Sequence, residues 1–343
     1  MRERRRHILA ADIGGTNCRL ARFSLLPEGR LVQERAVWVG SPSLQTTEHL
    51  LVALERELEL HPAHADATVL AVAGPVEGGV CGRLTNGRLA LDVRPLLASG
   101  VPSVRVINDF VAQACACLTD MGAQARLLWP SGSSWAPPAV PVRAPRAVMG
   151  AGTGLGVAAL FPLDMAVPDA DGWLVAPSEG GHAAFPFMGE EEAAFHQFLR
   201  RALRLPYARG DDVLSGRGLA LLHEFLAGER LAPDEVGRRA LGGPTPTLRW
   251  YARFYGRACR NVMLTTLCSG GLWITGGIAV RNPLCVDCEA FFAELHDAPA
   301  FAGWLRNIPV RLLEDAESGL WGAARYGRML LERQTGVRAP GVA

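Results

Sequence analysis

The stretch DIGGTN, residues 12–17, stands between two apolar segments, His7 to Asp12 and Cys18 to Leu26, that have the composition of β-strands. The glycine pair at positions 14 and 15 marks a tight turn between these segments. A third strand is expected from Arg30 to Val39. Three consecutive strands joined by short turns predict a meander at the start of the chain.

A second turn of the same kind occurs farther along the chain. The segment GAGTGLG, residues 150–156, lies between two more predicted strands, Ala147 to Gly150 and Leu155 to Phe161. The order strand, glycine–threonine turn, strand is therefore repeated. This repetition predicts a duplicated domain core.

Both turns have the composition of a phosphate-binding site. Glycine lets backbone N–H groups approach an anion, and the hydroxyl groups of Thr16 and Thr153 add donors. Two such turns on two lobes would clamp a polyphosphate, and Asp12 at the preceding strand end could hold Mg²⁺ through water. An ordinary hairpin is the alternative for each turn taken alone. A dinucleotide fingerprint is disfavoured, because neither turn leads directly into a helix.

A candidate general base follows a strand in the first part of the chain. The predicted strand Val104 to Ile107 ends in Asn108-Asp109 and runs into a helical stretch, Phe110 to Leu118. Open α/β sheets bind ligands at the carboxyl ends of their strands, so a carboxylate at Asp109 could serve as a base. The alternative role for Asp109 is the N-cap of the helix.

The rest of the chain contains further strands and is mainly helical in its second half. Residues 130 to 145 hold five prolines and no apolar periodicity, so they are predicted to form an exposed loop. The other predicted elements are a helix Thr46 to Leu60, a strand Thr68 to Ala73, a hairpin around Gly78-Gly79, helices Glu190 to Leu203, Gly218 to Leu226, Asp234 to Leu241 and Thr247 to Leu267, and strands Leu272 to Thr275 and Val310 to Leu313.

Length and composition predict a globular enzyme of two domains. The chain has 343 residues, and a domain typically has about 150. It is 49% hydrophobic with a net charge of +1, so nucleic acid is not an expected partner. The apolar run Ile8 to Ala11 is too short for a signal peptide, and no stretch approaches the roughly 20 apolar residues of a membrane helix. We therefore expect a cytoplasmic protein without a membrane partner.

The cysteines and the basic residues exclude several kinds of site. The eight cysteines are irregularly spaced and are predicted to be reduced thiols. Cys285 and Cys288 form a lone C-x-x-C, a weak zinc signal because a structural site needs four ligands. The sequence contains no lysine, which excludes a Walker-type P-loop, the protein-kinase ion pair and Schiff-base chemistry.

Seven short motifs follow one another in order over most of the chain. They are DIGGT at 12–16, AGPV at 73–76, IND at 107–109, GTGLG at 152–156, EGGH at 179–182, VLSGRGL at 213–219 and ITGGI at 274–278. This series resembles the bacterial glucokinase family. The resemblance implies a two-lobed α/β fold of the actin-like ATPase (ribonuclease H-like) class, with mixed sheets flanked by helices and a cleft between the lobes. It implies a small lobe of residues 1–118 plus 316–343, a large lobe of residues 119–315, and a homodimer.

The resemblance also implies roles for individual residues. Asp109 matches the catalytic base, which accepts the proton of the sugar 6-hydroxyl. The implied sugar ligands are Asn108, Asp109, Glu179, His182 and Asp211. The residues expected to bind ATP and Mg²⁺ are Asp12, through water to the metal, and Gly14, Gly15, Thr16, Asn17, Gly152, Thr153, Gly154, Gly276 and Gly277. The segment Glu317 to Gly322 matches the start of a helix that returns to the first lobe, where hinge or packing duty is expected.

Two departures from the family pattern concern the sugar. Asp211 replaces a family Glu and is one methylene shorter, and Leu89 replaces the Trp of a Thr-Asn-x-x-Trp motif. The leading function is phosphorylation of glucose to glucose 6-phosphate by ATP. Another preferred hexose, and ADP or polyphosphate as donor, stay open. The alternatives are a sugar- or nucleotide-sensing regulator with little catalysis, which the retained Asp109 disfavours, and an actin-like or chaperone ATPase, which the EGGH loop disfavours.

Overall fold

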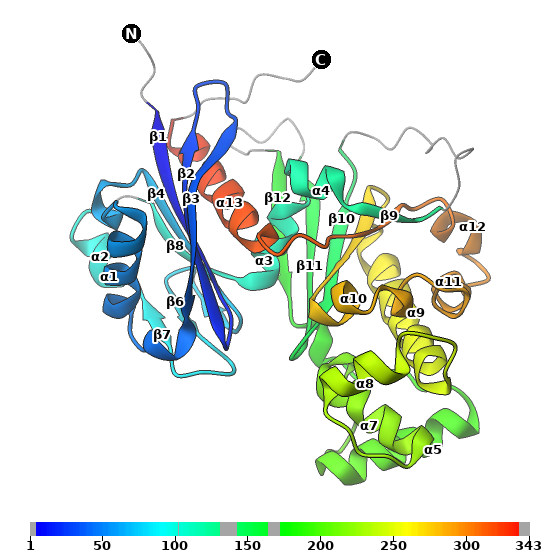
Figure 1. Cartoon of the computed structure of the whole chain (residues 1–343). Helices are drawn as coiled ribbons and strands as arrows, with labels where there is room; N and C mark the ends of the chain where they lie inside the picture. The colour runs from blue at the N-terminus through cyan, green and yellow to red at the C-terminus, as the bar shows by residue number, and fades with distance from the viewer. Residues whose placement is uncertain (1–4, 102, 131–142, 164–171, 336–343) are drawn as a thin grey trace. The chain divides into compact units, whose positions relative to one another are not determined.

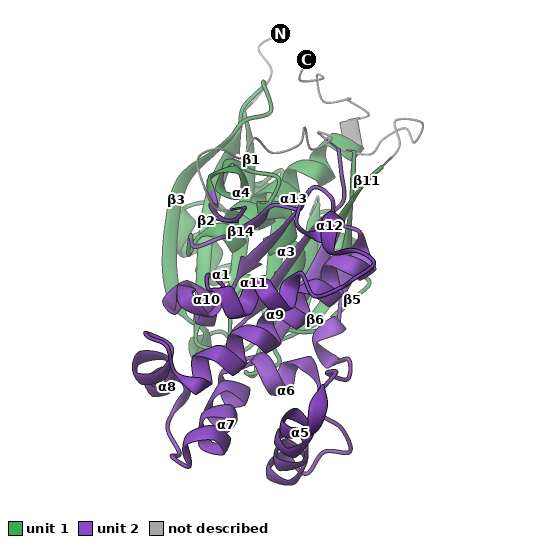
Figure 2. Ribbon diagram, turned by 90° about the vertical axis from the view of Figure 1, so that its right-hand side faces the viewer, with its two compact units in different colours: residues 1–124, 160–176, 315–343 green, residues 125–159, 177–314 purple. Residues whose placement is uncertain are grey.

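The computed structural model describes residues 5–101, 103–130, 143–163 and 172–335 (Figure 1). The chain forms two compact units (Figure 2). Unit 1 comprises residues 1–124, 160–176 and 315–343, and unit 2 comprises residues 125–159 and 177–314. The domain limits expected from the sequence, 1–118 plus 316–343 and 119–315, stay a prediction.

The first 124 residues and the C-terminal helix build most of unit 1. Their elements are β1 (Arg6–Ile13), β2 (Asn17–Leu25), β3 (Leu31–Gly40), α1 (Thr47–Leu58), β4 (Ala67–Val72), β5 (Val76–Glu77), β6 (Cys81–Arg83), β7 (Ala90–Asp92), α2 (Arg94–Ala98), β8 (Val104–Asn108), α3 (Asp109–Ala116), α4 (Asp120–Gln124) and α13 (Ser318–Thr335). Two 3-10 turns, η1 (Ser41–Ser43) and η2 (Pro62–His64), lie among them.

The remaining elements follow from residue 126 to residue 312. They are β9 (Arg126–Trp129), β10 (Arg146–Ala151), β11 (Leu155–Pro162), β12 (Trp173–Ser178), η3 (Gly180–His182), α5 (Gly189–Leu203), α6 (Gly210–Leu214), α7 (Gly216–Ala227), α8 (Pro233–Ala240), α9 (Pro246–Thr266), β13 (Gly271–Thr275), α10 (Gly277–Arg281), η4 (Pro283–Cys285), α11 (Glu289–Leu295), α12 (Ala302–Leu305) and β14 (Val310–Leu312).

The main sheet of unit 1 has the strand order β3-β2-β1-β4-β8. The predicted meander is confirmed, because β2 pairs antiparallel with both β1 and β3. Strand β4 then pairs in parallel with both β1 and β8. A second sheet of three short strands, β5-β6-β7, contains the predicted hairpin around Gly78-Gly79.

Alternating side chains of β1 supply the two apolar layers of unit 1. Leu9, Ala11 and Ile13 belong to a core that includes Leu50 and Leu54 of α1. Ile8 and Ala10 belong to a second core, which contains residues of α3 and α13, including Val111, Leu320 and Ala323. Successive residues of a strand point to opposite faces, so both faces of the sheet are covered.

The six-stranded sheet repeats the plan of the unit 1 sheet. Its order is β12-β11-β10-β13-β14-β9, and β13 pairs in parallel with both β10 and β14. In each of the two sheets, three consecutive strands lie in reverse order beside two later strands that are parallel to the first. The duplicated core predicted from the two glycine–threonine turns is therefore confirmed.

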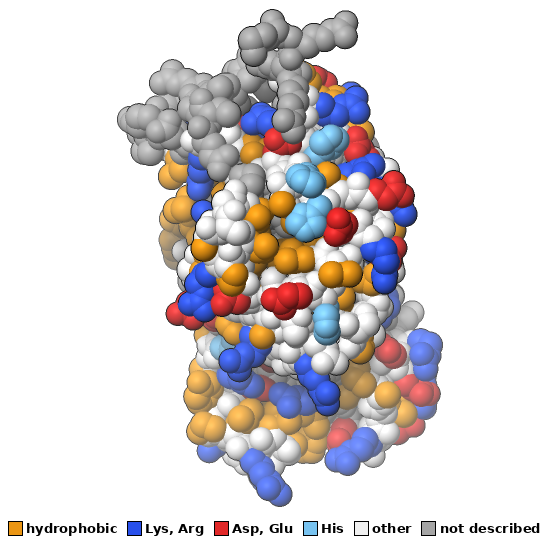
Figure 3. Space-filling view, turned by 90° about the vertical axis from the view of Figure 1, so that its left-hand side faces the viewer, with side chains coloured by type: hydrophobic (Ala, Val, Ile, Leu, Met, Phe, Trp, Pro, Cys, Tyr) orange, Lys and Arg blue, Asp and Glu red, His pale blue; other side chains and the backbone are white. Residues whose placement is uncertain are grey.

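All strands and helices that the sequence pattern predicted outside the proline-rich loop are present, with small differences at their ends. The loop prediction for residues 130 to 145 falls mostly on residues 131–142, which lie outside the described residues. All eight cysteines are free thiols, as predicted. No helix in the described ranges is long and apolar enough to cross a bilayer. Basic and acidic side chains are interspersed with apolar ones on the face in Figure 3.

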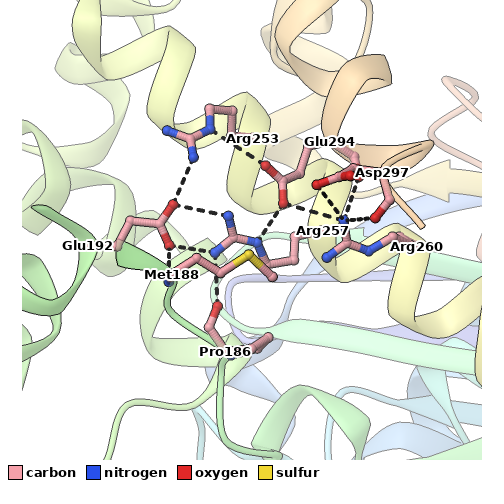
Figure 4. A network of polar contacts seen from close by, with 8 residues as sticks. All are labelled: Pro186, Met188, Glu192, Arg253, Arg257, Arg260, Glu294 and Asp297. Carbon is pink, nitrogen blue, oxygen red and sulfur yellow. Dashed lines mark hydrogen bonds and ion pairs between the residues drawn. The ribbon is translucent and has the colours of Figure 1, made fainter. Parts of the chain in front are cut away.

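A buried ionic network joins three helices of unit 2 (Figure 4). Arg257 of α9 is completely buried and lies between two buried carboxylates, Glu192 of α5 and Glu294 of α11. Its Nε donates to Glu294 at 2.7 Å and its Nη1 donates to the carbonyl oxygen of Pro186 at 2.9 Å. The amide of Met188 donates to Glu192 at 2.7 Å. The network therefore fixes residues 186–188, just after the EGGH motif.

Removing the central cation should strongly destabilise the protein. Arg257→Met leaves two carboxylates buried without this partner, and breaking a buried ion pair in this way typically costs about 3–5 kcal/mol. The free energy of unfolding from urea titration measures the effect. Arg249→Met, at an exposed position on the same helix, is the matched control and should change stability by less than about 0.5 kcal/mol. Equal effects of the two substitutions would contradict this account of the network.

Candidate functional site

In unit 1 the parallel strand register brings the predicted site residues to one edge of the sheet. Asp12 of β1 lies beside Ala71 of β4, which lies beside Ile107 of β8. The next row is Ile13, Val72 and Asn108. The turn after β1 and the pair Asn108-Asp109 therefore follow neighbouring positions at the carboxyl end of the sheet, with one strand between them.

The turn of residues 14–17 is held from outside by Ser41. The amide of Gly14 donates to the carbonyl of Asn17 at 3.0 Å. The hydroxyl of Ser41 donates to the carbonyl of Gly14 at 2.7 Å, and its amide donates to the carbonyl of Thr16 at 3.1 Å. A Cβ on Gly15 would lie 2.9 Å from the carbonyl oxygen of Asn86, so this position requires glycine. Gly15, Thr16 and Asn17 are exposed and available to a ligand.

Asp12 is a nearly buried carboxylate held by one arginine. Its side chain is 12% exposed, and Arg19 Nη1 donates to its Oδ2 at 2.8 Å. Burial raises the pKa of Asp12 above the ordinary value, and the charge and hydrogen bond of Arg19 oppose this rise only in part. The same guanidinium stacks over the ring of Trp38 at 4.3 Å. A Cβ on Gly319 would lie 2.5 Å from Asp12 Oδ2, so the first turn of α13 closes directly over this carboxylate.

Asn108, rather than Asp109, is the N-cap of α3. Asn108 Oδ1 accepts from the amide of Phe110 at 2.8 Å, and its Nδ2 donates to the carbonyl of Gly74 at 3.1 Å. Asp109 is the first residue of the helix, and its Oδ1 accepts from the same amide at 3.1 Å. The capping role considered for Asp109 therefore belongs to its neighbour.

In unit 2 the EGGH loop, Asp211 and the VLSG segment all contact residues 152–155. The amide of Leu155 donates to Oδ1 of Asp211 at 2.7 Å. A Cβ on Gly181, in the EGGH loop, would lie only 2.0 Å from the carbonyl oxygen of Leu155. The amide of Gly216, in the VLSG segment, donates to the carbonyl of Gly152 at 2.9 Å. The turn is thus braced by two other segments, while Thr153 is exposed.

The EGGH loop is tied to the segment that precedes α6. The amide of Phe185 donates to the carbonyl of Ala208 at 2.9 Å, and the amide of Gly210 donates to the carbonyl of Ala183 at 3.0 Å. Glu179 and His182 are exposed, with Glu179 Oε2 3.6 Å from His182 Nε2. The other ring nitrogen of His182 is 3.0 Å from Nη1 of Arg209. The loop therefore presents a carboxylate and an imidazole side by side.

Asp211 and Asp212 have different surroundings. Asp211 uses one carboxylate oxygen to accept from Leu155, as described above. The side chain of Asp212 is fully buried and accepts from Arg209 and Arg217. Although burial alone would raise it, the pKa of Asp212 is lowered by hydrogen bonds and charge from these arginines. Asp211 thus contacts the segment of the glycine–threonine turn, whereas Asp212 forms ion pairs with Arg209 and Arg217.

Gly276 and Gly277 lie between β13 and the short helix α10. Gly276 has a φ of 91°, and a Cβ there would lie 2.5 Å from the carbonyl oxygen of Ala151, next to the turn of residues 152–154. Only glycine combines this dihedral with this close approach. Gly277 is exposed.

The departure from the family pattern at Leu89 lies in an apolar core. Leu89 is fully buried in the apolar core of unit 1 that also contains Leu84 and Leu91. A side chain in this core cannot contact a sugar hydroxyl, because a bound sugar must be reached from solvent. The replacement of Trp by Leu89 is therefore a change of core packing.

A magnesium ion at Asp12 fits a water-mediated contact. Among the residues that the structure describes, no group of three or more His, Cys, Asp or Glu side chains could enclose a metal. Mg²⁺ is commonly held by one or two carboxylates together with substrate phosphates and several waters. Asp12 supplies one carboxylate, and Arg19 already donates to one of its oxygens. Asp12 therefore offers one carboxylate, which suits an ion held through water.

Several residues that support these segments were missed from the sequence. They are Arg19, Ser41, Asn86, Leu155, Arg209 and Asp212. The Arg209–Asp212 pair had a signal, because the two residues are three apart with opposite charge at the start of a helix. The role of Leu155 had none, since its amide and carbonyl make the contacts.

Comparisons with known proteins cover most of the chain. The family model described as Glucokinase matches residues 9–329. A glucokinase from Nitrobacter hamburgensis is 33% identical over 326 residues, covering 91% of this chain and 94% of the relative. The crystal structure of a glucokinase from an Antarctic psychrotroph has a TM-score of 0.77 and 26% identity, covering 94% of this chain and 98% of that chain.

A more distant solved structure gives the same fold. Glucokinase from Balamuthia mandrillaris, crystallised in complex with glucose, has a TM-score of 0.72 at 23% identity and covers 94% of each chain. The predicted α/β actin-like fold, with a mixed sheet flanked by helices in each half, is confirmed by these likenesses and by the two sheets.

The raised pKa of Asp12 predicts a pH-dependent effect of its removal. The folded protein binds this proton more readily than the unfolded chain, so ionised Asp12 destabilises the fold at neutral pH. Asp12→Asn should therefore increase the free energy of unfolding at pH 7. The gain should shrink as the pH falls through the folded pKa towards the ordinary value of about 3.9. Urea titrations between pH 7 and about pH 4 measure the difference.

Asp92 provides a control of opposite sign. Hydrogen bonds from Arg94 lower the pKa of Asp92 to about 2. Asp92→Asn should reduce stability at pH 7, and the loss should shrink as the pH falls from the ordinary carboxyl value of about 3.9 through about 2. A destabilised Asp12→Asn variant at pH 7 would show instead that the attraction of Arg19 outweighs burial at Asp12.

Proposed function

The chain belongs to the glucokinase family, and from this premise we propose that it transfers the terminal phosphoryl group of ATP to the 6-hydroxyl of a hexose, with glucose preferred. The observation that carries the proposal is the strand register of unit 1. It puts Asn108-Asp109 and the Asp12 turn on one edge of the sheet, at the ends of the two strands that flank β4. A base and a phosphate-binding turn on one sheet edge suit phosphoryl transfer to a hydroxyl.

Asp109 is the proposed general base. Its carboxylate accepts the proton of the sugar 6-hydroxyl as the oxygen bonds to the terminal phosphorus and the bond to the ADP oxygen breaks. The neighbouring Asn108 is fixed by two hydrogen bonds, to Phe110 and Gly74, which keep the strand end rigid. A positioned base typically contributes about 10² to 10⁴ in rate. Positioning and charge stabilisation account for the rest.

The two glycine–threonine turns are the proposed phosphate ligands. Gly14, Gly15, Thr16 and Asn17 in unit 1, and Gly152, Thr153 and Gly154 in unit 2, offer backbone amides and hydroxyl donors. Gly276 and Gly277 would lie against the adenosine, because they present bare backbone. Asp12 would hold the water shell of Mg²⁺, which supplies positive charge to the phosphates. The chain has no lysine to share this task.

The proposed sugar ligands combine donors and acceptors. Glu179 accepts only, Asn108 and His182 can do both, and Asp211 retains one carboxylate oxygen after accepting from Leu155. A sugar hydroxyl both donates and accepts, so a mixed set of ligands suits it. Asp211 reaches less far than a Glu because it has one methylene fewer, and its hydrogen bond to Leu155 fixes its direction. This restricts which hydroxyl it can contact.

Asp109→Asn should abolish turnover while leaving sugar affinity nearly unchanged. The amide keeps the shape of the side chain but does not accept the hydroxyl proton, so kcat should fall by about 10² or more. A coupled ADP-release assay measures turnover, and calorimetric titration with glucose measures affinity. Asp120→Asn, at an exposed helix start nearby in the sequence, is the control and should keep wild-type kcat. An active Asp109→Asn enzyme would refute the assigned base.

A panel of hexoses with several phosphoryl donors tests the substrate. We expect glucose with ATP to give the highest kcat/KM. The shorter reach at Asp211 should reduce discrimination at one ring hydroxyl by about 1 to 3 kcal/mol, roughly 5- to 150-fold in kcat/KM. Sugar binding without turnover for every donor would favour a sensing role on the same fold. A different hexose at the top of the panel would correct the substrate but keep the reaction.

A further inference from the structure

We infer that Arg209 is a positioning residue for His182: its guanidinium donates to Nδ1 and thereby holds the imidazole proton on Nε2, next to Glu179. The distance from Arg209 Nη1 to His182 Nδ1 is 3.0 Å, and His182 Nε2 lies 3.6 Å from Glu179 Oε2. The effect of this arrangement on sugar binding rests on the proposed function. The tautomer of His182 is independent of that function.

Arg209 is held in a fixed orientation by a buried carboxylate. Its Nε donates to Asp212 Oδ2 at 2.8 Å and its Nη2 donates to Asp212 Oδ1 at 2.9 Å. Asp212 is fully buried, and its position is also fixed because it accepts from the amide of Arg209 at 3.1 Å. A bidentate pair of this kind fixes the plane of the guanidinium. The remaining Nη1 is therefore aimed at His182.

The chemistry of the guanidinium determines the tautomer of the imidazole. Arginine has five N–H donors and no acceptor, and it stays charged at any physiological pH. Nδ1 of His182 must then be the acceptor of this contact. A neutral imidazole that accepts at Nδ1 carries its proton on Nε2. Arg209 thus makes the exposed nitrogen of His182 a donor.

The result is one donor and one acceptor side by side on the EGGH loop. Nε2–H of His182 donates, and the carboxylate of Glu179 accepts. A single hydroxyl can satisfy both groups at once, because it accepts from His182 and donates to Glu179. A fluorine or a hydrogen at the same ring position cannot. The pair can therefore recognise a hydroxyl group, and Arg209 makes His182 the donor of the pair.

The segment of residues 209–212 also links this pair to the turn of unit 2. Arg209 contacts His182, and Asp211, two residues on, accepts from the amide of Leu155 beside the turn of residues 152–154. Residues 209–212 therefore contact both the EGGH loop and the segment that contains the turn of residues 152–154. A substitution at Arg209 should act on sugar binding and leave the Asp211 contact in place.

The tautomer can be measured without any substrate. Protein labelled with ¹⁵N-histidine at about pH 8, above the ordinary histidine pKa of about 6.5, gives long-range ¹H–¹⁵N correlations that distinguish Nε2–H from Nδ1–H. The His182 signals are assigned by their loss in His182→Gln. We expect Nε2–H alone in the wild type and in Arg209→Lys, which keeps a donor, and a mixture of tautomers in Arg209→Met. Wild-type Nδ1–H, or an unchanged pattern in Arg209→Met, would overturn the inference.

Arg217→Met is the matched control for a structural effect. Arg217 also donates to Asp212, at 2.9 Å, but its side chain is 57% exposed and its hydrogen bond goes to Asp212 rather than to the loop. If Arg209→Met acted only by unpairing Asp212, then Arg217→Met would change the His182 signals in the same way. We expect Arg217→Met to leave them unchanged. Circular dichroism and thermal melting confirm that each variant is folded.

Kinetics then separate this inference from the proposed function. For Arg209→Met we expect the KM for glucose to rise about tenfold, the loss of roughly one well-placed hydrogen bond, with kcat changed less than about threefold. Its preference for glucose over one of the deoxy and deoxyfluoro glucoses should also shrink. If the wild type turns over glucose and Arg209→Met has the same KM and the same preference for glucose, the inference is contradicted. No turnover of any hexose would contradict the proposed function and leave the tautomer result standing.

Discussion

The parallel pairing of β4 with β1 and β8 is the constraint on which the site in unit 1 depends. It sets Asp12, Ala71 and Ile107 in one row across three strands, so the loops that follow these strands begin at the same edge. The arrangement comes from backbone hydrogen bonds and from alternating apolar faces that are both buried. A slip of one residue would turn each face of β4 to the wrong core, so the register is strongly fixed.

The two turns share a plan that extends beyond their glycines. In unit 1 the turn of residues 14–17 is held by Ser41, and Asn86 approaches it so closely that Gly15 is required. In unit 2 the corresponding turn is held by the amide of Gly216 and by Asp211 at Leu155. Each turn is therefore a short loop whose backbone is fixed by segments from elsewhere in its own unit. Such a loop presents its amides in a set geometry before any ligand binds.

The sequence predicted the repeated sheets and most of their strands because those features follow from local patterns. Apolar runs such as Thr68 to Ala73, bounded by turn residues, indicate strands wherever they occur. The ordered motifs also located the candidate site residues. What the sequence missed depends on three-dimensional proximity. The burial of Leu89, the Arg209–His182 contact and the use of the Leu155 backbone involve no local pattern. The sequence also did not decide between Asn108 and Asp109 as the N-cap of α3, because both residue types are favoured at that position.

The packing of α13 has a consequence for how the chain is made on the ribosome. Leu320, Ala323, Ala324 and Leu331 complete an apolar core whose buried strand residues lie within the first 107 residues. Those strands leave the exit tunnel on the order of ten seconds or more before the last helix is translated. Until then the part of this sheet face that α13 covers stays exposed. The residues of unit 2 are nearly all translated in this interval, so unit 2 can fold before unit 1 is complete. During the same interval the amino-terminal sheet must be protected from aggregation.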